Sequence, residues 1–175
     1  MLIDLNEVLK NDGRVMQTDV MPDMKQFVSK MGAFPIVMQQ PVSLNIRNKG
    51  DRELQITGDT VLTVRIPCDR CLEDVDVTLD LHFEKEADLK KSEAESQRTL
   101  EDQVYLEGYN LDVDKLVYSE LLVNWPSKVL CKEDCKGICS ICGTNLNQKT
   151  CDCRKDETDL RMAKIQEIFN KFKEV

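Results

Sequence analysis

Residues 74–84, DVDVTLDLHFE, decide the fold of this 175-residue chain. Apolar side chains occupy every second position and polar ones the positions between, which is the pattern of a β-strand with one buried and one solvated face. The only histidine, His82, falls among the polar positions, so we interpret it as a solvated side chain rather than a metal ligand or general base. The stretch predicts one strand of an antiparallel sheet.

The same alternation extends toward the N-terminus. Apolar residues recur at every second position in 42–46, 54–56 and 62–66, and residues 48–51 (NKGD) supply turn chemistry between the first two runs. Gly58 and Asp59 interrupt the series, and we expect a β-bulge or a second turn there. Residues 36–86 are therefore predicted to form antiparallel strands, within a β-rich region that spans residues 1–86.

Helical signals follow this region. Residues 87–111 form a charged linker and connecting segment, and Asp112 can cap a helix that ends before Pro126. Apolar residues at helical spacing predict a second helix at 158–173. The predicted class is α+β: an antiparallel β-sheet in the N-terminal half, followed over residues 112–175 by a helix, a zinc-ribbon-like cysteine module and a C-terminal helix.

Six cysteines crowd into residues 131–153 with the spacing C-x3-C-x3-C-x2-C-x8-C-x-C. Residues 139–143, CSICG, have the form of a zinc knuckle, in which a tight turn presents two thiolates to one ion. Another C-x2-C pair, Cys68 and Cys71, lies in the connection between two predicted strands, where zinc ribbons place half a site. The candidate metal ligands are Cys131, Cys135, Cys139, Cys142, Cys151 and Cys153, with Cys68 and Cys71 as additional candidates.

Disulfides are the competing interpretation, because the chain has 8 cysteines, an even number. The N-terminus shows no signal peptide and no stretch is apolar enough to span a membrane, so we expect a cytoplasmic protein whose thiols stay reduced. Short paired thiolates favour zinc over an iron–sulfur cluster. The spacing leaves open whether one or two ions bind. Cys139 and Cys142 take their partners from Cys131 and Cys135 or, as we slightly prefer, from Cys151 and Cys153.

Charge is unevenly distributed along the chain, whose net charge is −8. Residues 1–127 carry a net −10 and residues 128–175 a net +2, so only the cysteine-rich tail suits contact with phosphate. The candidate contacts to RNA or to a protein partner are the cations near the cysteines: Arg70, Lys128, Lys132, Lys136, Lys149, Arg154 and Lys155.

Catalysis is not indicated. A nucleophilic cysteine needs a neighbouring base, and His82 lies far from the cysteine cluster in sequence. No phosphate-cradling glycine loop is present, and no pair of carboxylates stands out from an acidic surface. We therefore expect neither an enzyme nor a small-molecule substrate.

Four motifs together resemble the YceD family, whose members are described as large ribosomal RNA subunit accumulation proteins. They are CDRCL at 68–72 after the strands, Trp125-Pro126 after the helix, residues 131–153 from CKEDCKGICSICGTNLN to CDC, and residues 159–161 (DLR) at the start of a helix. The resemblance covers roughly residues 40–165. Leu160 and Ser140 stand where the family usually has proline, and neither change removes a candidate ligand.

The resemblance implies a cytoplasmic factor that supports accumulation of large-subunit ribosomal RNA and assembly of the large ribosomal subunit. Its partner would be that RNA or a ribosomal protein, and its zinc module would serve as a rigid recognition surface. The alternative is a zinc-stabilised adaptor that binds a basic ribosomal protein through the acidic residues 1–127, without contact to RNA. A thiol enzyme is the least favoured of the three.

Overall fold

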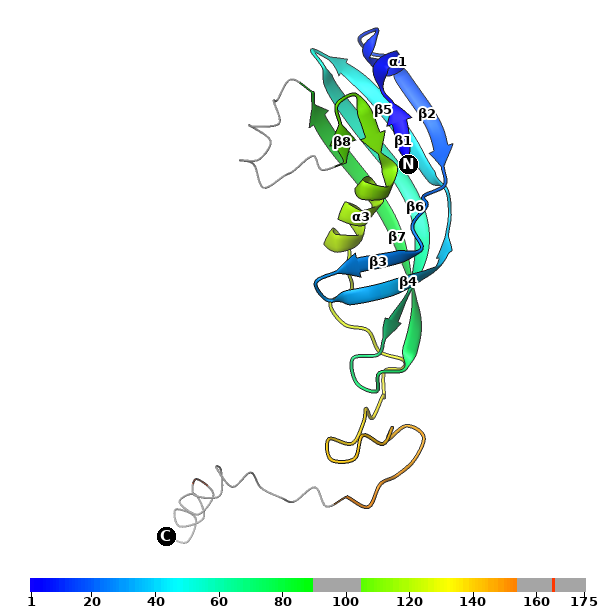
Figure 1. Cartoon of the computed structure of the whole chain (residues 1–175), viewed down its shortest axis with the longest axis vertical. Coiled ribbons are helices and arrows are strands. Elements are labelled where there is room, and N and C mark those ends of the chain that lie inside the picture. The colour runs from blue at the N-terminus through cyan, green and yellow to red at the C-terminus, as the bar shows by residue number, and fades with distance from the viewer. Residues whose placement is uncertain (90–104, 154–164, 166–175) are drawn as a thin grey trace.

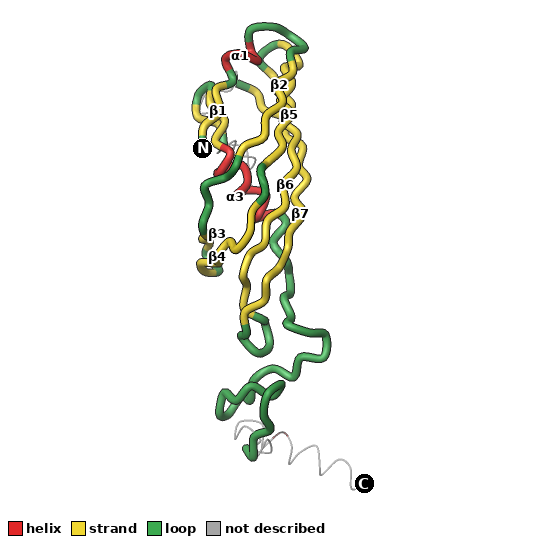
Figure 2. Tube along the Cα trace, turned by 90° about the vertical axis from the view of Figure 1, so that its right-hand side faces the viewer, coloured by secondary structure: helices red, strands yellow, loops and turns green. Residues whose placement is uncertain are grey.

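The computed structural model describes residues 1–89, 105–153 and Ile165. Over these residues the chain is mostly β, with two antiparallel sheets, two helices and an irregular cysteine-rich module at one end (Figures 1 and 2). The expected C-terminal helix at 158–173 lies outside the described residues except for Ile165, which is exposed.

The larger sheet has six antiparallel strands. Its order is β2-β5-β6-β4-β3, and β7 pairs with the other side of β6. The strands are β2 (Val15–Val20), β3 (Gln26–Ser29), β4 (Gly32–Gln39), β5 (Val42–Gly50), β6 (Glu53–Pro67) and β7 (Asp74–Asp88). The predicted strands in residues 36–86 are thus confirmed as β4 to β7, and β2 and β3 extend the sheet beyond the prediction.

A smaller sheet and two helices pack against one face of the larger sheet. The smaller sheet has the order β1-β9-β8, with β1 at Leu2–Asp4, β8 at Leu106–Glu107 and β9 at Asn110–Asp112. Helix α1 spans Asn6–Leu9 and α3 spans Val113–Val123. Part of the expected connecting segment 87–111 therefore forms strands, while residues 90–104 lie outside the described residues.

The long hairpin β6–β7 joins the central strand of the larger sheet, β6, which also pairs with β4 and β5, to the strand β7, which pairs with β6. Every residue from Glu53 to Pro67 pairs in an unbroken register with a residue of β7. The expected bulge or turn at Gly58 and Asp59 is therefore wrong, because Gly58 lies in the regular ladder. Its missing side chain makes room for a neighbour: a Cβ there would lie 2.5 Å from Cζ of Phe83.

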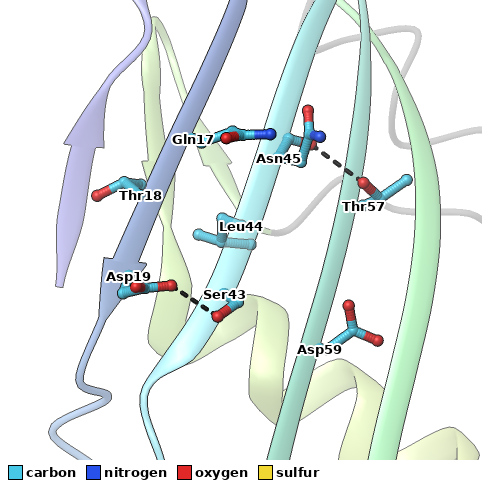
Figure 3. Close-up of a pocket in the computed structure, with 8 residues that line it drawn as sticks. All are labelled: Gln17, Thr18, Asp19, Ser43, Leu44, Asn45, Thr57 and Asp59. Carbon is cyan, nitrogen blue, oxygen red and sulfur yellow. Dashed lines mark hydrogen bonds between the residues drawn. The ribbon is translucent and has the colours of Figure 1, made fainter.

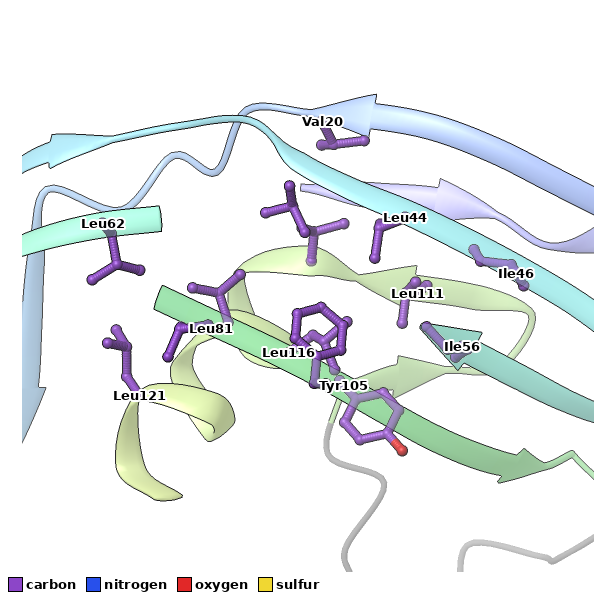
Figure 4. Packing of buried hydrophobic residues seen from close by; sticks show 14 of the residues in the cluster. Val20, Leu44, Ile46, Ile56, Leu62, Leu81, Tyr105, Leu111, Leu116 and Leu121 are labelled. Atoms are coloured by element: carbon purple, nitrogen blue, oxygen red, sulfur yellow. The ribbon is translucent and has the colours of Figure 1, made fainter. Parts of the chain in front are cut away.

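The core lies between the inner face of this sheet and the layer of α3 and the smaller sheet (Figure 4). The strands contribute residues such as Leu44, Ile56 and Leu81, and α3 contributes Leu116 and Leu121, all buried. The polar register of β7 faces solvent on the opposite side, as the alternation predicts.

Local chemistry explains where α3 begins. The Asp112 side chain accepts hydrogen bonds from the backbone amides of Asp114 (3.1 Å) and Lys115 (3.3 Å), which is the predicted N-cap. The apolar side of α3 then packs into the core. The predicted helix at 112–124 is confirmed.

An aromatic cluster fixes the chain where it leaves α3 for the cysteine module. The Trp125 ring lies 4.7 Å from that of Phe27 and 4.8 Å from that of Phe34, centroid to centroid, and these two rings come from the β3–β4 hairpin. The chain therefore leaves the core at a fixed point and continues toward the tip of the β6–β7 hairpin (Figure 1).

Candidate metal centre

The connection between β6 and β7 is a tight turn that carries the first cysteine pair. The amide of Leu72 donates to the carbonyl of Cys68 (2.9 Å), and the amide of Cys68 donates to the carbonyl of Glu73 (2.8 Å). Leu72 adopts a positive φ of 62°, which closes the turn. Cys68 and Cys71 are consequently both buried at the tip of the hairpin.

The segment after α3 docks on this turn through Asp69. The Asp69 amide donates to the Val129 carbonyl (2.9 Å), and the Val129 amide donates to the Asp69 carboxylate (2.7 Å). Val129 is itself buried in the main core. This pairing places Cys131 and Cys135 beside the hairpin pair.

Arg70 secures the second half of the docked segment. Its guanidinium Nη1 donates to the carbonyl of Cys135 (2.9 Å), and its own carbonyl accepts from the amide of Ile138 (3.1 Å). Gly137 adopts a φ of 77°, and a Cβ there would lie 3.0 Å from the Arg70 carbonyl oxygen. A glycine is therefore required where the segment crosses the hairpin.

Four cysteines meet at this junction and form what we call the inner tetrad. Their sulfurs all lie within 4.8 Å of one another, with 3.4 Å between Cys71 and Cys131 and 3.9 Å between Cys68 and Cys135. Three of the four are buried, and Val75 and Leu130 pack against them. The pair that the sequence offered only as additional ligands is thus half of a buried set.

The remaining cysteines form a second set, the outer tetrad, within one continuous stretch of chain. Sulfurs of Cys139, Cys142, Cys151 and Cys153 also lie within 4.8 Å of one another, and Cys142 is exposed. The structure thus brings Cys139 and Cys142 together with the pair that we preferred, Cys151 and Cys153. Among the described residues, the eight cysteines therefore form two candidate metal sites rather than one.

The knuckle geometry of the outer tetrad follows from Gly143. Its φ is 72°, and its amide donates to the Cys139 carbonyl (2.9 Å). The Cys139 amide in turn donates to the Thr144 carbonyl (2.8 Å), which closes the loop around the two sulfurs. The Thr144 hydroxyl lies 3.1 Å from the Cys142 sulfur.

Electrostatics at the inner tetrad divide its thiols into two kinds. Burial of Cys68 opposes ionisation, but the backbone amides of Arg70, Cys131 and Cys71 outweigh it and lower the Cys68 pKa to about 6. The Glu73 amide favours the Cys71 thiolate, but burial and the neighbouring thiols outweigh it and raise the Cys71 pKa to about 12. Clustered thiols thus resist ionising together, and a bound cation removes that resistance.

The outer tetrad shows the same division. Thr144, through its hydroxyl and its amide, lowers the pKa of Cys142 to about 6. Cys142 raises the pKa of Cys153 to about 12, and burial adds to that shift. Each tetrad therefore combines amide-stabilised thiolates with thiols that ionise readily only beside a positive charge.

Both tetrads fit a tetrahedral metal ion. A zinc ion with four sulfurs at about 2.3 Å sets those sulfurs about 3.8 Å apart, which agrees with the sulfur–sulfur separations of 3.4 and 3.9 Å in the inner tetrad. All eight cysteines are free, and these separations exceed the roughly 2.05 Å of a disulfide bond.

The cationic residues predicted to contact RNA or a protein partner differ in their surroundings. Arg70 holds the Cys135 carbonyl, which the sequence did not indicate, and Lys132 lies 4.0 Å from Asp134. Lys128, Lys136 and Lys149 are exposed around the tetrads, while Arg154 and Lys155 lie outside the described residues.

A polar hollow of about 510 Å³ lies on the outer face of the larger sheet, away from the tetrads (Figure 3). Within it the Ser43 hydroxyl donates to Asp19 (2.6 Å). His82, on the same face, is exposed and pairs with Asp59, as its place in the polar register predicts. The imidazole therefore contacts a carboxylate rather than a hydroxyl or thiol.

Comparison with known proteins places these features in a family. Residues 56–169, which include the β6–β7 hairpin from Ile56 onward and all eight cysteines, match the family described as "Large ribosomal RNA subunit accumulation protein YceD". The chain belongs to the YceD family. The family resemblance seen in the sequence is thus confirmed.

A curated relative agrees with this assignment. The chain is 27% identical over 149 residues to "Large ribosomal RNA subunit accumulation protein YCED homolog 1, chloroplastic" of Arabidopsis thaliana. That alignment covers 67% of this chain and 44% of the relative, so the chain spans less than half of the relative's length. No solved structure matches the chain. Among the described residues, no helix has the length and apolar character needed to cross a membrane.

Proposed function

We propose that this protein is a non-enzymatic factor that supports accumulation of large-subunit ribosomal RNA and assembly of the large ribosomal subunit. The observation that carries the proposal is the extent of the YceD match, which covers most of the β6–β7 hairpin, helix α3 and both tetrads. The cytoplasm, where thiols stay reduced, is the proposed compartment.

The metal that we propose for both tetrads is zinc. Four thiolates and no oxygen or imidazole ligand form the closed, soft donor set of structural zinc sites. The Cys68–Cys71 and Cys131–Cys135 pairs would hold one ion and the outer tetrad a second. Elemental analysis of anaerobically purified protein should find two zinc ions per chain, and a stoichiometry near zero would contradict the proposal.

A structural rather than catalytic role follows from the ligand set. With four protein sulfurs each ion has no open position for water or substrate. The one imidazole pairs with Asp59, so it does not serve as the base for a hydroxyl or a thiol. The Ser43 hydroxyl contacts Asp19 and the Cys71 thiol contacts Glu73, and both of these partners are carboxylates rather than an imidazole.

The proposed contact surface for the ribosomal partner surrounds the tetrads. Exposed Lys128, Lys132, Lys136 and Lys149 lie there, and Arg154 and Lys155 follow the last cysteine in sequence. Arg70 is a less favourable contact, because its guanidinium already donates to Cys135. Lysines in such a surface would bind phosphate and RNA shape rather than base sequence.

A deletion strain tests the function. Loss of the protein should lower large-subunit relative to small-subunit ribosomal RNA, and the wild-type chain should restore the ratio. A variant with Lys132, Lys136, Arg154 and Lys155 changed to glutamate should restore it poorly while still folding, because exposed charges contribute little to stability. The matched control changes Lys10 and Lys30, exposed lysines outside the module, to glutamate. An unchanged ratio in the deletion strain would contradict the proposal.

An adaptor that binds a basic ribosomal protein is the second candidate. It is favoured by the outer face of β7, where five exposed carboxylates alternate along one strand: Asp74, Asp76, Asp80, Glu84 and Glu86. Purification of the tagged protein with and without ribonuclease separates the two candidates. A protein partner that survives ribonuclease supports the adaptor, whereas binding that depends on RNA and weakens steeply with salt supports direct RNA contact.

A further inference from the structure

Asn147 lies between the two tetrads and touches the inner one. Its side-chain Nδ2 donates to the Cys135 sulfur (3.3 Å) and to Asn145 Oδ1 (3.0 Å), and its Oδ1 accepts from the backbone amide of Lys136 (2.9 Å). The orientation of the amide is fixed by chemistry, because a backbone N–H can only donate and must face the oxygen. The nitrogen consequently faces the sulfur.

The turn that carries Asn147 belongs to the outer tetrad. Residues 144–148 follow directly on the knuckle, and the Thr144 carbonyl accepts from the Cys139 amide (2.8 Å). Ile138 and Asn145 form an antiparallel bridge, and the Leu146 amide donates to the Gly137 carbonyl (2.9 Å). The turn is therefore held between an outer ligand, Cys139, and the segment that carries an inner ligand, Cys135.

Few other contacts from residues 1–89 and 105–153 hold this turn in place. The Gln148 side chain donates to Glu73 (2.5 Å) at the base of β7, but Thr144 to Asn147 are only partly buried and contribute nothing to the main core. Ordering such a stretch of chain costs conformational entropy that these contacts offset only in part. A cation that joins Cys139 and Cys142 to Cys151 and Cys153 closes the loop and supplies the missing order.

We infer that Asn147 couples the two tetrads: metal in the outer tetrad orders the turn at 144–148, which holds the Asn147 amide on the Cys135 sulfur and strengthens metal binding by the inner tetrad. The inference rests on the proposed occupancy of both tetrads by metal. Asn147 acts as a positioning residue, since it touches a ligand sulfur and not the ion. Thermodynamic linkage requires that the inner metal strengthens the outer site by the same factor.

The expected loss of metal affinity can be taken from hydrogen bonds to metal ligands in other proteins. Loss of a hydrogen bond to a metal ligand typically weakens metal affinity about 10- to 100-fold. Asn147→Asp removes the donor to sulfur and keeps an oxygen for the Lys136 amide, so it should weaken the inner site by at least about 10-fold. The matched control is Gln148→Ala, which removes the neighbouring contact to Glu73 and leaves the sulfur contact intact.

The experiment titrates the full-length apo-protein with Co²⁺ under anaerobic conditions against a competing chelator. Thiolate-to-cobalt charge-transfer absorption counts the ions and gives the affinity of each site. The inner-site affinity is compared in the wild type, in Asn147→Asp, in a Cys142→Ser/Cys151→Ser variant without a functional outer site, and in the combination. We expect a loss of at least about 10-fold in the two separate variants and little further loss when they are combined.

A second readout keeps the test valid if a variant folds poorly. In protein loaded with ¹¹³Cd at both sites, Asn147→Asp should shift the cadmium resonance of the inner site and leave that of the outer site in place, and Gln148→Ala should shift neither. Coupling by Asn147 would be overturned if the wild type binds two ions but the losses of inner-site affinity in the separate variants multiply in the combined variant. An unchanged cadmium resonance of the inner site in Asn147→Asp would overturn it as well. Absence of any stoichiometric Co²⁺ in the wild type would instead overturn the proposed metal function.

Discussion

The sulfur of Cys71 lies 3.4 Å from that of Cys131, although 60 residues separate them in the chain. The first sulfur is carried by the tip of the β6–β7 hairpin, and the second by the segment that leaves α3 near Trp125. A metal ion at this point would join two parts of the fold that few apolar contacts hold together, because Val75 and Leu130 are the main apolar residues packed there. The inner tetrad is therefore the place where a metal ion would connect the larger sheet to the cysteine-rich module.

Removal of metal should unfold the cysteine-rich module and leave the larger sheet folded. Structural zinc supplies roughly 10–16 kcal/mol of apparent binding free energy to small cysteine-rich modules, which bury little apolar surface of their own. Under chelation, hydrogen exchange should show loss of amide protection in residues 128–153 and retained protection in β5, β6 and β7. Cys71→Ser should have the same effect, whereas Cys142→Ser should affect mainly residues 138–153. Unchanged protection of the module in the chelated protein would contradict a structural role.

Gly58→Ala should destabilise the β6–β7 hairpin. The added Cβ would lie 2.5 Å from Cζ of Phe83 and 2.9 Å from Cδ2 of Leu44, and both side chains are buried. Overpacking of this kind costs about 1–3 kcal/mol in the free energy of unfolding. Chemical denaturation measures the loss, and the Phe83→Leu background is the control, since the shorter side chain makes room. An equal loss in both backgrounds would show that Phe83 is not the cause.

Glu120→Ala should also destabilise the fold. The carboxylate is buried on α3, and its Oε1 lies 2.7 Å from Nζ of Lys85 on β7 in an ion pair that lacks hydrogen-bond alignment. Removal of one partner of a buried pair leaves the other charge uncompensated and costs about 3 kcal/mol, at the low end here because Lys85 is only half-buried. Thermal or denaturant unfolding checks the value. Lys85→Met combined with Glu120→Leu should recover most of the loss, and no recovery would point to packing instead of charge.

His82 should titrate above its ordinary pKa of 6.5, because the side chain of Asp59 hydrogen-bonds the imidazole and stabilises its charged form. A raised pKa in the folded state means that the pair contributes its stability fully below pH 6.5 and loses it as the pH rises through the folded pKa. NMR titration of the only histidine measures this directly. Asp59→Asn should move the pKa back toward 6.5, and an unshifted pKa in the wild type would contradict the pairing.

Local patterns predicted a large part of the fold. The alternation in residues 74–84 gave β7, the NKGD sequence marked the β5–β6 turn, and Asp112 capped α3. These features depend on residues close in sequence, so periodicity and capping chemistry reveal them. Strands β1, β2 and β3 were missed because they are short or carry only a weak alternation. In addition, β1 and β2 are stabilised by pairing with strands that are not their neighbours in sequence, β9 and β5, whereas β3 pairs with the next strand, β4.

Gly58 shows how a local rule fails in a tertiary context. A glycine followed by an aspartate between two apolar runs is typical of a turn or bulge, yet β6 continues through both residues. The glycine is needed because any larger side chain would collide with the ring of Phe83 on the neighbouring strand. Gly58 and Phe83 are 25 residues apart, so a local sequence pattern does not reveal that they are in contact.

For the candidate metal centre, the sequence by itself determined the candidate ligands and which of them share one turn. The C-x2-C spacing at Cys68 and Cys139 places two thiols on one turn, since the spacing and a following tight turn leave the chain few alternatives. The preference for Cys151 and Cys153 as partners of the knuckle also came from the sequence, because residues 143–150 are long enough to form a hairpin that returns the chain to the knuckle.

Only the tertiary structure decided that the eight cysteines divide into two tetrads. The hairpin pair meets Cys131 and Cys135 because Val129 pairs with Asp69 and because Trp125 fixes the exit from α3. Those contacts depend on the packing of a whole sheet against a helix, and no spacing within the cysteine segment encodes them. The same packing turns Arg70 from an apparent surface cation into the residue that holds Cys135 in place, because a side chain's role is set by what the fold brings within reach of it.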